Sequence, residues 1–153
     1  MRVLGTSRRR GHMPEGVEEV SLDELFARSD AIVISCALTD ETRGIVDARL
    51  IGRMRPHAVL INVSRGAVID TAALVAALKA ERIGGAALDV FEVQPLPRDS
   101  ELLACQNVLL TPHSAALTAS SSRAMAVGAA EEMLRILRGE RPINLVNPDY
   151  RSA

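Results

Sequence analysis

Arg65, Asp89 and His113 are three polar residues that could together hold an anion and move a proton. Each of them follows a short apolar run. An arginine at the end of a strand can bind a carboxylate through two parallel hydrogen bonds, and a histidine changes its charge near neutral pH. Taken singly, Arg65 could also be an ordinary surface arginine, and His113 could be a structural histidine. If the fold brings them together, they suit hydride transfer at a hydroxyl-bearing carbon, with the histidine as proton carrier.

The apolar runs that precede these residues are typical of strands. Five runs, each bounded by polar or turn residues, occupy residues 2–4, 31–34, 58–61, 86–88 and 108–110. They are continuous rather than alternating, which favours strands that are buried on both faces, as in parallel sheets. We therefore expect these runs to form an open sheet.

Helix signals lie between the runs. The sequence SLDE at residues 21–24 is a capping box, further helix starts are expected at Asp47 and at Asp70 or Thr71, and a last long helix is expected over residues 118–137. Strands that alternate with helices predict right-handed crossovers and an α/β fold with a doubly wound parallel sheet. Such a sheet binds its ligands beyond the carboxyl ends of its strands, which is where the three polar residues would lie.

The composition excludes several other classes of protein. The chain has 153 residues, of which 48% are hydrophobic and 24% charged, and its net charge is −1. These values rule out a disordered tail and a collagen-like fibre, and they give no electrostatic case for binding nucleic acid or a membrane surface. No apolar run approaches the length that spans a bilayer. Cys36 and Cys105 are expected to be buried, reduced thiols of a cytoplasmic protein, and no metal site is expected.

Three consecutive arginines follow the first apolar run, at residues 8–10, and no acidic residue accompanies them. In a dinucleotide-binding sheet, an acidic residue after the second strand selects NAD through the ribose 2′-hydroxyl, whereas an arginine accommodates the 2′-phosphate of NADP. The loop that contains Ser7 and these arginines could therefore bind that phosphate. It could equally be a solvated basic turn.

Four longer segments carry these residues in a distinctive combination. They are ISCALTDETRGI at residues 34–45, INVSRGAVID at 61–70, ALDVFEVQPLP at 87–97 and LTPHSAALT at 110–118. Together they resemble the signature segments of the D-isomer-specific 2-hydroxyacid dehydrogenases, over nearly the whole chain and with matching spacings. The resemblance implies a Rossmann-like fold and hydride transfer between a nicotinamide cofactor and a small 2-oxo or 2-hydroxy acid. We also expect a homodimer.

The resemblance implies a role for particular residues. Arg65 would bind and polarise the substrate carboxylate, His113 would be the acid/base, and Gln94 would orient the histidine. Ser7 followed by Arg8 is similar to the NADP-preferring glyoxylate and hydroxypyruvate reductases, which favours NADP as the cofactor, with NAD as the alternative. The implied cofactor contacts are Ser7, Arg8, Arg9, Cys36, Ala37, Val63, Ser64, Arg65, Asp89, His113, Ser114, Ala115 and Ala116.

Three features depart from the family pattern. The family has Glu where this chain has Gln94, so the histidine here loses a carboxylate that would stabilise its imidazolium. Ser35 and Ala37 stand where the family commonly has His and Pro. No G-x-G-x-x-G motif occurs in the chain, although the family carries one on its first βα turn to bind the cofactor pyrophosphate.

The missing glycine motif determines the domain organisation that we expect. Residues 1–117 should form an NAD(P)-binding domain that is incomplete on its N-terminal side, without the first βα unit. Residues 118–153 should form a helix and a tail that, in full-length members of the family, return to the substrate domain. Two alternatives stay open: a catalytically inactive fragment or assembly module derived from such a dehydrogenase and, on the strength of Gln94 alone, a formate-type dehydrogenase.

Overall fold

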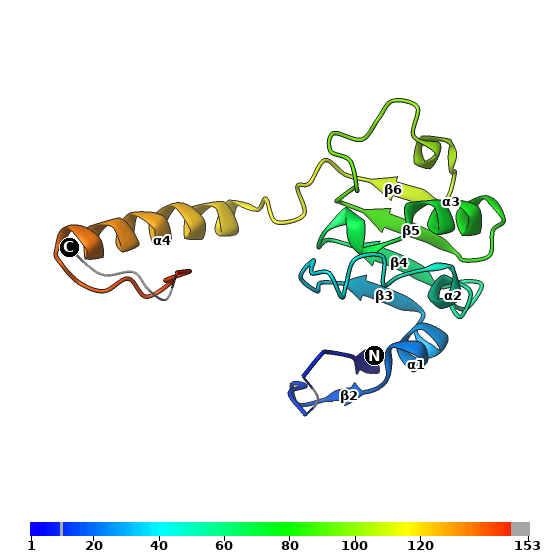
Figure 1. Cartoon of the computed structure of the whole chain (residues 1–153), viewed down its shortest axis with the longest axis horizontal. Helices are drawn as coiled ribbons and strands as arrows, with labels where there is room; N and C mark the ends of the chain where they lie inside the picture. Colours follow the sequence, from blue (N-terminus) through cyan, green and yellow to red (C-terminus); the bar gives the residue numbers. More distant parts are fainter. Residues whose placement is uncertain (10, 148–153) are drawn as a thin grey trace. The chain divides into compact units, whose positions relative to one another are not determined.

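The computed structural model describes residues 1–9 and 11–147, and the chain forms two compact units, Met1–Ser114 and Ala115–Ala153 (Figure 1). Arg10, one of the three arginines, lies outside the described residues. The first unit consists of β1 (Val3–Gly5), β2 (Val17–Glu19), α1 (Leu22–Arg28), β3 (Ala31–Ile34), α2 (Ala48–Ile51), β4 (Val59–Asn62), α3 (Thr71–Lys79), β5 (Gly85–Leu88) and β6 (Val108–Leu110), with 3-10 helices at Gly66–Val68 and Glu101–Ala104. The second unit contains α4 (Ala119–Leu137).

The strand pairs are all parallel, as a doubly wound fold requires, but the strands form two sheets. The four strands β3, β4, β5 and β6 pair in that order, and β1 and β2 form a separate pair. The predicted strands at 31–34 and 108–110 are confirmed at both ends, and the predicted strands at 58–61 and 86–88 are confirmed to within one residue. The sequence does not predict β2, because its three residues, Val-Glu-Glu, contain no apolar run.

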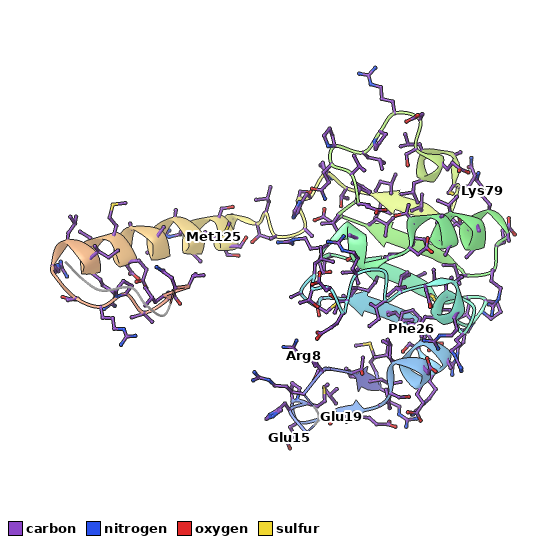
Figure 2. The ribbon with its side chains drawn as sticks, viewed as in Figure 1. Arg8, Glu15, Glu19, Phe26, Lys79 and Met125 are labelled. Atoms are coloured by element: carbon purple, nitrogen blue, oxygen red, sulfur yellow. The ribbon has the colours of Figure 1, made fainter. Side chains whose placement is uncertain are left out.

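Helices α1, α2 and α3 cover one face of the four-stranded sheet. Phe26 of α1, which is marked in Figure 2, Leu50 of α2 and Leu74 of α3 are each at most 1% exposed. They belong to one apolar cluster with Ile32 and Leu60 of the sheet. Burial of each such side chain contributes roughly 1.5–3 kcal/mol. This apolar layer holds the strands, and therefore the loops that follow them, in fixed positions.

The opposite face of the same sheet is exposed within the first unit. Val33, Ile61, Ala87 and Leu109 lie side by side across the four strands, and Val33 and Leu109 are 59% and 63% exposed. The expectation that these strands are buried on both faces is therefore wrong for this unit. A continuous apolar run makes both faces apolar, but burial also needs a covering element, and the three helices of the unit pack on the other face.

Polar side chains explain where the helices begin. The Ser21 hydroxyl accepts a hydrogen bond from the backbone N–H of Glu24, and the Glu24 carboxylate accepts one from the backbone N–H of Ser21. The predicted capping box is therefore confirmed. Asp47 and Asp70 each accept a backbone hydrogen bond in the first turn of α2 and α3. Helix α2 ends at Ile51.

Exposed ion pairs connect loops of the first unit. The Asp30 carboxylate pairs with His57 and Arg55, and these two partners, His57 first, hold the pKa of Asp30 below its ordinary value. The ammonium group of Lys79 on α3 likewise lowers the pKa of the Glu101 carboxyl. Because all of these groups face solvent, each pair contributes little to stability.

The second unit is built around α4. The hydroxyl of Thr118 caps this helix by accepting a hydrogen bond from the backbone N–H of Ser121. The Glu132 carboxylate accepts hydrogen bonds from the backbone N–H groups of Ile143 and Asn144, so the segment after the helix folds back along it. Met133 is 64% exposed, and no described residue of α4 is buried within its unit. Among the residues that the structure describes, no helix has the length and apolar character needed to cross a bilayer.

Candidate functional site

Loops at the carboxyl ends of the parallel strands carry the candidate residues. Arg65 follows β4, Asp89 follows β5 and His113 follows β6, and these three strands are direct neighbours in the sheet. Cys36 follows β3 in the same sheet, and Arg8, which is marked in Figure 2, follows β1 of the other sheet. The topology thus brings Arg65, Asp89 and His113 to one edge of one sheet.

A buried asparagine builds the turn that presents Arg65. Asn62 is 0% exposed, and its side-chain amide donates to the backbone carbonyl oxygen of Arg65 at 3.0 Å and accepts from the N–H of Ser64 at 3.0 Å. The guanidinium of Arg65 donates to the Ser64 carbonyl oxygen at 2.7 Å and is otherwise exposed, beside the half-exposed Val63. Asn62 is not among the residues predicted from the sequence, although a polar residue at the end of an apolar run is a signal for it.

Gly66 joins this turn to the loop that carries Gln94. A Cβ atom on Gly66 would lie 1.9 Å from the backbone carbonyl carbon of Phe91 and 2.2 Å from the backbone nitrogen of Glu92. Only a residue without a side chain allows two backbones to approach this closely. The Gly66 backbone therefore packs directly against the backbone of Phe91 and Glu92, at the start of the loop that carries Gln94.

His113 is held in an unusual backbone conformation next to Gln94. Its φ of 56° lies in the left-handed region, which few residues other than glycine adopt. Its Nδ1 lies 3.3 Å from Oε1 of Gln94. Both residues line a cavity of about 350 Å³ whose other walls are mostly apolar and include Phe91, Leu103 and Leu110. The structure thus brings together the two side chains that the resemblance implies are partners.

Asp89 connects the residues on both sides of His113. Its carboxylate is 4% exposed and accepts hydrogen bonds from the Thr111 hydroxyl at 2.5 Å and from the Ser114 N–H at 2.8 Å. Because Thr111 and Ser114 flank the histidine, Asp89 determines the path of the backbone through it. Asp89 is thus a positioning residue, in addition to the cofactor contact that the resemblance implies.

Two described residues of the loop after β1, Ser7 and Arg8, make side-chain contacts. The Ser7 hydroxyl donates to the Arg9 carbonyl oxygen at 2.6 Å, and the Arg8 guanidinium lies 3.2 Å from the Glu41 carboxylate. The side chains of Arg8 and Glu41 are 76% and 71% exposed, so this ion pair is weak enough for a competing anion to displace.

The two cysteines differ from the expectation that both are buried. Cys36 is exposed and Cys105 is half-buried, and both are free thiols. Cys36 is exposed because it lies in the loop after β3, two residues beyond the end of the strand. The carbonyl oxygen of its neighbour Ala37 accepts a hydrogen bond from the Thr42 hydroxyl at 2.7 Å, which closes this loop.

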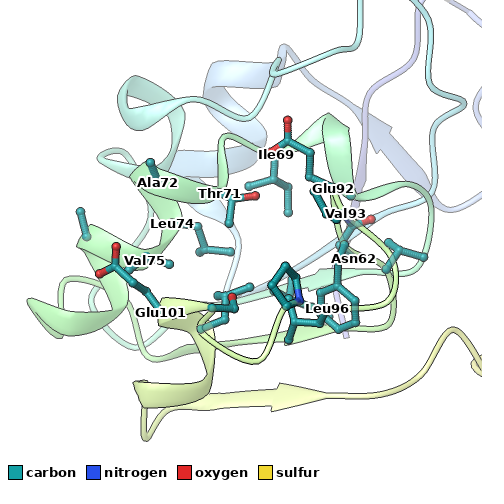
Figure 3. A pocket seen from close by; sticks show the side chains of 18 of the residues that line it. Asn62, Ile69, Thr71, Ala72, Leu74, Val75, Glu92, Val93, Leu96 and Glu101 are labelled. Carbon is teal, nitrogen blue, oxygen red and sulfur yellow. The ribbon is translucent and has the colours of Figure 1, made fainter.

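A larger cavity of about 740 Å³ lies between α3 and residues 90–102 (Figure 3). Its walls include Asn62, Ile69, Leu74, Val75 and Leu96. It borders the Gly66 turn, but Arg65, Gln94 and His113 do not line it, and no pattern in the sequence indicates it.

Two of the implied cofactor contacts, Ala115 and Ala116, belong to the second unit. Within it, the Ala116 carbonyl oxygen accepts a hydrogen bond from the Ser121 hydroxyl. Among the described residues, no group of three or more His, Cys, Asp or Glu side chains is arranged to hold a metal ion.

Gln94→Glu is expected to favour the protonated form of the His113 ring relative to the unaltered chain. A carboxylate next to Nδ1 stabilises the imidazolium, whereas the neutral amide does not. The ring signals of His113 in an NMR pH titration measure this shift. Gln106→Glu adds the same charge at an exposed position in a different loop and should leave the titration unchanged; equal shifts in both variants would contradict a direct contact.

The chain is similar to proteins of a known family. Residues 1–115 match the family model described as D-isomer specific 2-hydroxyacid dehydrogenase, NAD binding domain. The glyoxylate reductase of Aeropyrum pernix is 43% identical over 150 residues, which are 96% of this chain and 45% of that protein. The chain spans a little under half the length of the curated relatives it matches.

Two solved structures share the fold. A D-isomer specific 2-hydroxyacid dehydrogenase from Xanthobacter autotrophicus Py2, in complex with NADPH and MES, is 42% identical with a TM-score of 0.81, over 96% of this chain and 61% of that one. D-lactate dehydrogenase with NAD+ from Lactobacillus jensenii is 29% identical with a TM-score of 0.85, over 95% and 48% of the two chains. The expected Rossmann-like α/β fold is therefore confirmed.

Proposed function

Because this chain belongs to the D-isomer-specific 2-hydroxyacid dehydrogenase family, through its NAD-binding domain, we propose that it takes part in the NAD(P)-dependent interconversion of a small 2-oxo acid and its 2-hydroxy acid. Glyoxylate and hydroxypyruvate, which appear in the names of its relatives, are the first substrates to test. One observation carries the proposal: Arg65, Asp89 and His113 follow three adjacent parallel strands, with Gln94 3.3 Å from the His113 ring.

In this proposal Arg65 binds the carboxylate of the substrate. One of its terminal nitrogens donates to the Ser64 carbonyl oxygen, which orients the guanidinium. The remaining N–H groups are available for two parallel hydrogen bonds with a carboxylate. The positive charge next to the 2-oxo group also favours the negative charge that develops on its oxygen.

His113 transfers the proton. The amide oxygen of Gln94 can only accept, so this contact requires a hydrogen on Nδ1 and leaves Nε2 for the substrate. In the reduction, Nε2 of the imidazolium donates its proton to the carbonyl oxygen while the carbonyl carbon receives a hydride, which gives the 2-hydroxy acid and a neutral histidine. In the oxidation, neutral Nε2 takes the proton back.

The residues present fit the two ends of a nicotinamide cofactor. Arg8 and Arg9 offer cations for a phosphate on the adenosine side, and the half-exposed Val63 offers apolar surface next to Arg65. The bound cofactor would supply or accept the hydride. The chain has no G-x-G-x-x-G turn for the pyrophosphate, so we expect this chain alone to bind the cofactor weakly.

Arg8→Gln is expected to weaken NADPH binding about tenfold and to change NADH binding less than twofold. A hydrogen bond from arginine to a phosphate contributes roughly 1.5–3 kcal/mol, and only NADPH carries the 2′-phosphate. Nicotinamide fluorescence during titration measures both affinities. Arg98→Gln, which removes an exposed arginine from another loop, should change neither; equal weakening of both cofactors by Arg8→Gln would contradict the NADP preference.

The same titration tests the proposed function, followed by measurement of NADPH oxidation at 340 nm with glyoxylate and with hydroxypyruvate. Cofactor binding together with turnover that requires Arg65 and His113 would support it. Absence of cofactor binding up to millimolar concentration would instead favour the alternative, a catalytically silent module derived from the family. The homodimer and the cytoplasmic location stay predictions, which sedimentation analysis and cell fractionation would test.

A further inference from the structure

The cavity between α3 and residues 90–102 is separate from the candidate site. Its volume is about 740 Å³, which lies within the range of roughly 300–1,000 Å³ that is typical of small-molecule sites. Two segments that are apart in the sequence form its walls: α3 with the turn before it, and the loop after β5 (Figure 3). The proposed hydride transfer gives this cavity no role.

The floor of the cavity is apolar. Leu74 and Val75 of α3 contribute to it, together with Leu88 at the end of β5 and Leu102 in the second 3-10 helix. These four side chains are between 1% and 7% exposed, because they also belong to the apolar core of the unit. Core side chains are close-packed, so this floor has a defined shape.

The walls above the floor are also mainly apolar, but they are more open to solvent. Phe91 and Leu96 of the loop are half-buried, and Val93 is 60% exposed. On the other side, Ala72 and Ala76 are exposed positions of α3 with short side chains. An apolar group placed in the cavity would remove these side chains from water, so the hydrophobic effect favours its binding.

Carboxylates surround the opening of the cavity. Glu92, Asp99 and Glu101 line it, and Figure 3 shows Glu92 and Glu101 well apart on its rim. Lys79 is the only basic residue among the described residues of the lining, and its ammonium group pairs with Glu101. Within the described part of the chain, no ion pair or hydrogen bond engages the carboxylates of Glu92 and Asp99. The rim therefore has an excess of negative charge.

We propose that this cavity binds a small apolar molecule that carries one primary amine. The apolar body would lie on the floor, and the ammonium group would pair with the free carboxylates of the rim, Glu92 and Asp99. An anionic ligand is disfavoured there, because like charges repel. In a mostly apolar pocket, a few polar groups of this kind orient the ligand. This inference does not depend on the proposed oxidoreductase function.

Tryptamine is a suitable probe, because it joins an indole ring to a primary amine. The chain contains no tryptophan, so indole fluorescence comes from the ligand alone. Fluorescence anisotropy during titration with the full chain, at low ionic strength, measures the affinity. Absence of tryptamine binding up to millimolar chain concentration would overturn the proposal.

Two analogues change the charge next to the same ring. Tryptophol is neutral, and indole-3-propionate is an anion. Tryptamine should bind at least fivefold more tightly than tryptophol, and tryptophol more tightly than indole-3-propionate. Equal affinity for tryptamine and tryptophol would mean that the carboxylates do not select an amine, and would overturn the proposal.

Methyl signals in NMR spectra locate the bound tryptamine. Val75 and Leu102 of the floor should shift during the titration, whereas Val33 and Leu109, on the exposed face of the sheet, should not. Shifts at Val33 and Leu109 without shifts at Val75 would indicate adhesion to that face and would overturn the proposal. Shifts of Val75 that follow chain concentration without tryptamine would assign the cavity to a second copy, and would also overturn it.

A double variant tests the rim. Glu92→Gln combined with Asp99→Asn should weaken tryptamine binding at least fivefold and leave tryptophol binding within twofold. Glu15→Gln combined with Asp40→Asn removes the same charge from exposed positions outside the cavity and should change neither affinity. Equal weakening of tryptamine binding by the two double variants would overturn the proposal, since the rim carboxylates would then act only through the net charge.

Ala76→Phe tests the body of the cavity. A phenyl ring on this exposed position of α3 would occupy the opening, so tryptamine and tryptophol should both bind at least tenfold more weakly. Ala80→Phe adds the same ring at an exposed position outside the lining and should leave both affinities within twofold. Unchanged binding to Ala76→Phe would place the ligand elsewhere and overturn the proposal. Circular dichroism checks that both variants are folded, and the analogues decide the question if Ala76→Phe is not.

Discussion

Gly66→Ala is expected to lower the free energy of unfolding by about 3 kcal/mol, at the upper end of the cost of overpacking. The added Cβ would lie 1.9 Å from the backbone carbonyl carbon of Phe91, and no flexible side chain is there to move aside. Either the Arg65 turn or the loop that carries Gln94 must shift. Equilibrium unfolding in urea, followed by circular dichroism, measures the loss.

The same variant should also impair the site without altering any of its side chains. Because the contact links the turn of Arg65 to the loop of Gln94, a shift of either should disturb the Gln94–His113 contact, which the His113 ring signals report. Gly128→Ala is the matched control, since a Cβ there has nothing within 4 Å and alanine favours a helix. An unfolding midpoint for Gly66→Ala no lower than that of Gly128→Ala would show that the two backbones are not in contact.

Asp89→Ala is expected to cost about 3 kcal/mol of stability, for a different reason. This substitution removes the buried acceptor of the Thr111 hydroxyl and of the Ser114 N–H, and each donor left without a partner costs roughly 1–3 kcal/mol. Asp89→Asn keeps an acceptor oxygen and should lose about 1 kcal/mol. Urea unfolding compares the two variants.

An exposed aspartate provides the control for this pair. Asp99→Ala removes a carboxylate from the surface of a loop and should leave stability within about 0.5 kcal/mol of the unaltered chain. The order of stability should therefore be Asp99→Ala, then Asp89→Asn, then Asp89→Ala. Equal stability of Asp89→Ala and Asp99→Ala would mean that the carboxylate of Asp89 does not hold the segment around His113.

The sequence predicts where the candidate side chains lie better than how the surrounding loops are built. Arg65, Asp89 and His113 follow apolar runs, and apolar runs in a chain with intervening helices form neighbouring parallel strands. Side chains placed in this way can be anticipated from local pattern alone. The capping box at Ser21 is equally local, and it is also present in the structure.

Features that depend on distant parts of the chain could not be predicted. The contact between Gly66 and Phe91 joins residues that are 25 positions apart, and no local pattern distinguishes Gly66 from an ordinary turn glycine. The exposure of Val33 and Leu109 on one face of the four-stranded sheet could not be predicted either, because a run of apolar residues does not indicate whether another element covers it. The division of the strands into two sheets likewise depends on contacts throughout the first unit.

The left-handed backbone of His113 determines which amino acids position 113 can accept. Glycine adopts a φ of 56° without cost and asparagine with little, whereas β-branched residues are strongly disfavoured there. A library of all substitutions at this position, selected only for folding, should therefore retain Gly and Asn and lose Val, Ile and Thr. Asparagine is for the same reason a better inert replacement for the imidazole than alanine, whose own backbone cost would be added to the loss of the ring.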